Sequence, residues 1–85
     1  MNLIFSRLAW EQYLYWQLSD RQMLKKINAL IKSIESDGLL KGEGKPEILR
    51  YRKDYSRRIS DEHRLVYTLR DSNLYILSCR GHYQD

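Results

Sequence analysis

The stretch that most directly indicates the fold runs from Arg64 to Arg80 and reads RLVYTLRDSNLYILSCR. Residues 64–69 alternate between two faces, which is the period of a strand with one buried face. Asp71-Ser72-Asn73 has the composition of a turn, and 74–80 is again rich in residues that favour strands. The stretch therefore predicts an antiparallel hairpin with Arg64 toward solvent. The residues expected to face the core are Leu65, Tyr67 and Leu69.

Upstream of the hairpin the sequence predicts a short strand and two helices. The strand covers 3–5, and Ser6 can cap the helix that follows it. Ser19 is expected to begin the second helix, with Gln22 completing a capping box, and Asp37-Gly38 to end it. The strongest helical signal in the chain is the apolar stripe of this second helix, formed by Met23, Ile27, Leu30 and Ile34.

This order of elements predicts an α+β fold. We expect two N-terminal helices packed on one face of a twisted antiparallel β-sheet, with the other face free for function. The 85 residues are enough for one compact domain, residues 1–85. A core of this size is only marginally stable, so a protein partner or a homodimer would stabilise it.

Composition narrows the possible environments and partners. The net charge of +4 suits a polyanion such as RNA or an acidic protein. No apolar run approaches a membrane span, and a single cysteine, Cys79, cannot form an internal disulfide. We therefore expect a cytoplasmic protein. Two histidines and one cysteine at these distances do not indicate a metal site.

Several polar residues match the needs of metal-free RNA cleavage. That reaction requires a base for the 2′-hydroxyl proton, a cation for the phosphate and an acid for the 5′-oxygen. Glu47, Arg64 and His82 supply these three types of side chain, and Tyr83 could stack on a base. A basic stretch interleaved with tyrosines has the composition of a phosphate-binding surface; it includes Arg50, Arg52, Lys53, Arg57 and Arg58.

Each of these residues also has a structural interpretation. A glutamate after a proline is usually only solvated, and Arg64 could pair with Asp61 or Glu62. The basic run could be an edge strand that its charge keeps soluble, and His63 could be a structural histidine. Spacing alone therefore leaves the function open.

Across nearly its whole length the sequence resembles the Txe/YoeB toxins of the wider RelE-like superfamily. The most specific blocks of the resemblance are Gly44-Lys45-Pro46-Glu47, Ser56-Arg57-Arg58-Ile59, Glu62-His63-Arg64-Leu65-Val66-Tyr67, Cys79-Arg80 and His82-Tyr83. The resemblance implies a RelE-like, microbial ribonuclease-like fold. It also implies a ribosome-dependent mRNA interferase that cuts mRNA in the aminoacyl site, needs no metal or cofactor, and is neutralised by a YefM-like antitoxin.

The same resemblance implies roles for individual residues. Glu47 matches the general base of the family, Arg64 its phosphate-stabilising arginine and His82 its general acid. Tyr83 matches the tyrosine that usually ends the chain. Residues expected to bind the RNA are Lys45, Arg50, Arg57 and Arg58. Two alternatives stay open: a RelE- or ParE-like toxin with another target, and a non-catalytic basic module that binds RNA or protein.

Overall fold

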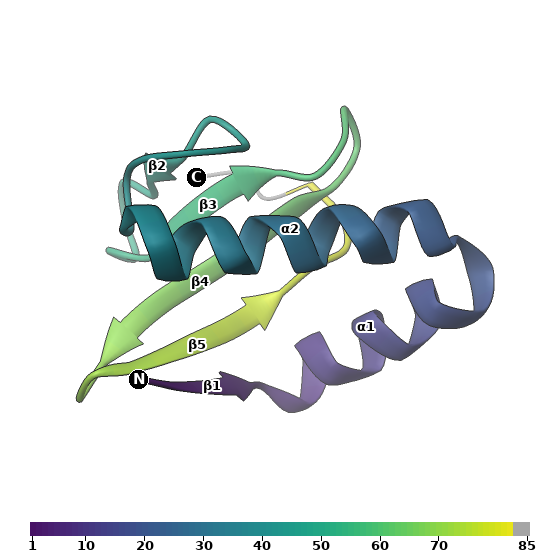
Figure 1. Ribbon diagram of the computed structural model, residues 1–85, viewed down its shortest axis with the longest axis horizontal. Coiled ribbons are helices and arrows are strands. Elements are labelled where there is room, and N and C mark those ends of the chain that lie inside the picture. Colours follow the sequence, from purple (N-terminus) through teal and green to yellow (C-terminus); the bar gives the residue numbers. More distant parts are fainter. Residues whose placement is uncertain (83–85) are drawn as a thin grey trace.

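In a computed structural model, which describes residues 1–82, five strands form one sheet and two helices pack against it (Figure 1). The elements in chain order are β1 (Asn2–Phe5), α1 (Arg7–Ser19), α2 (Arg21–Asp37), β2 (Glu47–Ile48), β3 (Tyr55–Arg58), β4 (Arg64–Arg70) and β5 (Asn73–Ser78). The strand order is β1-β5-β4-β3-β2. The α+β fold predicted from the sequence is therefore confirmed.

One part of that prediction is wrong, because the sheet is mixed. β1 runs parallel to β5, whereas the other neighbouring strands are antiparallel. Strands joined by short turns must be antiparallel, but both helices and three other strands separate β1 from β5 in the chain, so β1 can lie parallel to β5. Neither helix within residues 1–82 has the length and apolar content that crossing a membrane would require.

The helix boundaries follow local capping chemistry. The Ser6 hydroxyl accepts a hydrogen bond from the backbone N–H of Ala9 at 3.0 Å, as predicted for the start of α1. Asp20, rather than Ser19, caps α2, and its carboxylate accepts from the N–H groups of Gln22 and Met23 at 3.0 and 3.4 Å. Asp20 has the extended backbone of a cap, whereas Ser19 is still the last residue of α1.

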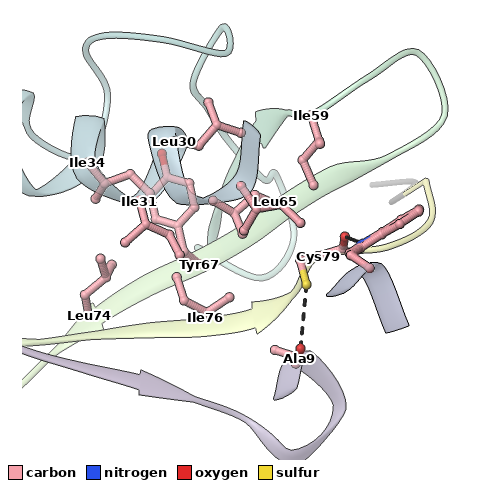
Figure 2. Close-up of a cluster of buried hydrophobic side chains, with 12 residues drawn as sticks. Ala9, Leu30, Ile31, Ile34, Ile59, Leu65, Tyr67, Leu74, Ile76 and Cys79 are labelled. Atoms are coloured by element: carbon pink, nitrogen blue, oxygen red, sulfur yellow. Dashed lines mark hydrogen bonds between the residues drawn. The ribbon is translucent and has the colours of Figure 1, made fainter. Parts of the chain in front are cut away.

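The core lies between α2 and the sheet (Figure 2). Ile27, Leu30 and Ile34 of α2 are buried, which confirms the predicted stripe. Leu65 and Tyr67 are fully buried, as predicted from the alternation of β4. Leu69 has the right parity but is 42% exposed, because β3 begins opposite Tyr67 and the end of β4 extends beyond it.

Arg57 is part of this core, and the prediction that it binds RNA is wrong. It pairs with Leu65 across the β3–β4 ladder and therefore shares its inward face. The Arg57 guanidinium donates to the Tyr67 hydroxyl at 2.8 Å and the Ser33 hydroxyl at 3.0 Å. It also donates to the backbone carbonyls of Gly38, Lys41 and Glu43, at 2.6, 2.6 and 2.8 Å. Its side chain therefore anchors the loop between α2 and β2.

Cys79 is fully buried, and its Sγ lies 3.6 Å from the carbonyl oxygen of Ala9 (Figure 2). Burial raises the pKa of this thiol to about 12, because the thiolate would lose its hydration. Burial also raises the pKa of Tyr67, although the hydrogen bond from Arg57 partly opposes that shift. Ionisation of the Cys79 thiol or the Tyr67 hydroxyl therefore lowers the stability of the folded state.

We expect the Cys79 contribution to stability to disappear as the pH rises from about 9 toward 12. A thiol with a raised folded-state pKa contributes fully below its unfolded pKa and loses that contribution as the pH approaches the folded value. Between pH 8 and 10.5, the free energy of unfolding in urea should fall by about 2 kcal/mol more for the wild type than for Cys79→Ala, in which any contribution of Tyr67 is retained. A thiol that reacts with a maleimide in the native protein as fast as a free cysteine would contradict this assignment.

Candidate active site

Glu47 and Arg64 meet on the sheet face opposite α2. Sheet register pairs Glu47 with Ser56, Ser56 with Val66, and Arg58 with Arg64, so these residues share one face. Arg64 Nη1 lies 3.1 Å from Glu47 Oε1, and their side chains are 24% and 55% exposed. A carboxylate and a guanidinium from strands that are not neighbours are thus held together at the open surface.

Ser56 lies between these two side chains and was missed by the sequence analysis. Its hydroxyl is 3.4 Å from both Glu47 Oε1 and Arg64 Nη1, and the residue is fully buried. The only sequence signal was parity, since Ser56 stands two residues before Arg58 on the same strand.

The backbone ties the segment that carries His82 to the start of β4. The N–H of Arg64 donates to the carbonyl of Gly81 at 3.0 Å. The N–H of Gly81 in turn donates to His63 Nδ1 at 2.8 Å, and the His63 ring packs edge-on against Trp16 with centroids 4.8 Å apart. His63 is therefore structural, and it positions the residue before His82.

His82 is exposed and lines a hollow of about 270 Å³. The hollow lies between α1, the strands β4 and β5, and the segment that follows β5. Its lining residues are Leu8, Gln12, Arg52, Val66, Leu77, Ser78, Arg80, Gly81 and His82. Gln12 was not predicted as a site residue, because nothing local in the sequence indicates that α1 borders this face. Arg80, in the segment after β5, was not predicted as a site residue either.

The other residues predicted to bind RNA differ in their exposure to solvent. Lys45 and Arg50 are exposed. Arg58 is partly buried and forms an ion pair with Asp61. The sequence left open that Arg64 pairs with Asp61 or Glu62, but Arg64 pairs with Glu47 instead. Tyr83 lies outside the described residues.

Residues 1–82 contain no group of three or more His, Cys, Asp or Glu side chains that could hold a metal ion. The side chains that the site does offer are a carboxylate, a guanidinium and an imidazole. A carboxylate or an imidazole can accept or donate a proton, and a guanidinium can bind a phosphate with two parallel hydrogen bonds. This set suits acid–base chemistry on a phosphodiester.

An α+β fold that carries a carboxylate, a guanidinium and an imidazole is that of a small basic protein equipped to act on a phosphodiester. A family model described as the YoeB-like toxin of bacterial type II toxin–antitoxin systems matches residues 5–83. The chain belongs to this family.

Individual relatives are similar over their full length. Toxin YoeB from Synechocystis sp. is 50% identical, with 99% of each chain covered. The YoeB dimer from Staphylococcus aureus superimposes with a TM-score of 0.91 at 52% identity, and 98% of each chain is covered. The YoeB–YefM complex from the same organism gives a TM-score of 0.89 at 50% identity, again with 98% of each chain covered.

Proposed function

We propose that this toxin is an endoribonuclease that cuts mRNA on the ribosome, in the aminoacyl site, and so inhibits translation. The observation that carries the proposal is the Glu47–Arg64 contact of 3.1 Å on the face opposite α2. A backbone hydrogen bond of 3.0 Å joins Arg64 to the residue before His82. A base, a phosphate-binding cation and an acid thus come from β2, β4 and the segment after β5.

Glu47 is the general base and Arg64 binds the scissile phosphate. Glu47 accepts the proton of the ribose 2′-hydroxyl as the 2′-oxygen attacks phosphorus. When RNA binds, the phosphate takes over the guanidinium of Arg64, which frees the carboxylate for this step. Arg64 stabilises the negative charge that grows on the phosphate oxygens as the new bond forms.

His82 is the general acid. Its imidazolium donates a proton to the 5′-oxygen as the phosphorus–oxygen bond breaks, so that the leaving group departs as a neutral hydroxyl. The products are a 2′,3′-cyclic phosphate and a 5′-hydroxyl end. All proton transfers use side chains of the protein, and the reaction requires no metal ion or cofactor.

The remaining basic residues hold the RNA. Lys45 and Arg50 are exposed, and Arg58 pairs with an exposed aspartate, so all three are candidates for phosphate contacts. Tyr83 follows His82 directly and is proposed to stack on a base. Arg57 is excluded from this set because it is fully buried.

The activity is tested on programmed ribosomes. Purified toxin is incubated with ribosomes that carry a defined mRNA, and the new ends are mapped and their chemistry identified. Cleavage within the aminoacyl site that leaves 5′-hydroxyl ends would support the proposal. Ends that carry a 5′-phosphate would contradict the mechanism, and intact mRNA would favour a toxin with another target or a non-catalytic binding module.

A cognate YefM-like antitoxin is the second proposed partner, because the Staphylococcus aureus relative forms a complex with YefM. The net charge of +4 and the basic residues Arg50, Arg58 and Arg64 favour an acidic segment across the active-site face. The same relative forms a dimer, and we propose a homodimer for the free toxin. Since its target is the translating ribosome, the toxin would act in the cytoplasm.

A further inference from the structure

The hollow beside His82 contains a hydrogen-bond donor that no other residue of the described range 1–82 uses. The N–H of Cys79 donates to Gln12 Oε1 at 2.7 Å, so the orientation of the Gln12 amide is fixed by a donor that cannot be reversed. The NH₂ group must then occupy the other end of the amide. Among residues 1–82, no hydrogen bond uses this NH₂ group, and Gln12 lines the hollow.

Arg80, whose guanidinium is a planar cation, also lines this hollow. The Arg80 guanidinium lies 3.6 Å from the centre of the Tyr15 ring, so the stack restricts where the cation can move. Leu8, Val66 and Leu77 supply apolar surface in the lining. Apolar walls, a planar cation and one oriented donor are features that bind a planar, polar-edged ring.

The size of the hollow fits one such ring. Its volume of about 270 Å³ lies just below the ~300–1,000 Å³ of sites for drug-sized molecules. A single base, unstacked from its neighbours, is smaller than such molecules. RNA recognition commonly uses bases displaced in this way.

We propose that this hollow binds the base of the nucleotide on the leaving-group side of the scissile bond and that Gln12 selects the base. This inference rests on the proposed ribonuclease function. His82 lines the hollow and serves the leaving 5′-oxygen, whereas Glu47 is not part of the lining, so the adjoining nucleotide is the one that departs. The Gln12 NH₂ group favours a base with a carbonyl oxygen on its edge, which is guanine, uracil or cytosine rather than adenine.

The sharpest test is Gln12→Glu. Glutamate keeps an oxygen that can accept the hydrogen bond from the Cys79 N–H, so this contact within the fold remains. It replaces the NH₂ donor that would face the base by a second acceptor. Cleavage is measured on ribosomes with four mRNAs that differ only in the base after the cut. For the wild type we expect mRNAs with guanine, uracil or cytosine after the cut to be cleaved about tenfold faster than the one with adenine, and for Gln12→Glu we expect this preference to be lost or reversed.

Gln17→Glu is the matched control, because Gln17 is exposed on the same helix outside the hollow and receives the same charge. It should keep the wild-type base profile. Equal rates on all four mRNAs with the wild type would overturn the inference, even if Gln12→Glu failed to fold. If Gln12→Glu cuts at a normal rate with the wild-type base preference, only the inference about Gln12 is overturned. If the wild type leaves the mRNA uncut, the proposed ribonuclease function is overturned as well.

Discussion

Replacing Glu47 by glutamine is expected to slow mRNA cleavage on the ribosome by about 10²–10⁴-fold, the usual contribution of a general base. Glutamine has nearly the same shape and can still hydrogen-bond to Ser56 and Arg64, but its amide cannot accept the 2′-hydroxyl proton. The loss should therefore appear in the single-turnover rate at saturating ribosome concentration. Binding to the ribosome should change little.

Glu43→Gln is the control for that experiment. Glu43 is an exposed glutamate in the loop before β2, and its backbone carbonyl, rather than its carboxylate, contacts Arg57. The control should cut at the wild-type rate. A Glu47→Gln variant that cuts within about threefold of the wild type, far below the range for a general base, would show that another group removes the proton.

The largest expected effect on stability is that of Arg57→Met. Methionine fills part of the space but makes none of the five hydrogen bonds of the guanidinium. Each buried acceptor left unpaired costs roughly 1–3 kcal/mol, so we expect a loss of about 3–5 kcal/mol in the free energy of unfolding. That is a large fraction of the ~5–15 kcal/mol that stabilises a typical domain.

The neighbouring arginine provides the control, because Arg58→Met removes the same side chain from the other face of β3. Arg58 forms a solvent-exposed ion pair with Asp61, and such pairs contribute at most about 1 kcal/mol. Urea unfolding followed by far-UV circular dichroism should separate the two variants clearly. Equal midpoints for both would mean that the Arg57 network contributes no net stability.

Local patterns in the sequence determined much of the fold. Residues 64–80 predicted the β4–β5 hairpin, and Leu65 and Tyr67 occupy the core face that their alternation indicated. The α2 stripe around Ile27 and the Ser6 cap were also predictable. These features depend on the period of a single element or on atoms within one helical turn, and both can be read from neighbouring residues.

The active-site residues were predicted from the chemistry of their side chains and from the family resemblance, but only the tertiary structure determined which of them contact one another. Arg57 and Arg58 are adjacent in the sequence, and alternation requires only that one faces inward. The register of β3 against β4 pairs Arg57 with Leu65, which buries Arg57 and leaves Arg58 on the open face.

The same limit applies to longer-range contacts. The parallel pairing of β1 with β5, the partnership of Glu47 with Arg64 and the approach of Gln12 to Cys79 all join segments that are distant in the chain. A sequence pattern predicts which face of its own helix or strand a residue occupies. It does not predict which residue of another element that side chain will contact. The chain alone therefore determined which chemical groups were available and which elements they belong to, while packing α1, α2 and the strands together decided which groups meet.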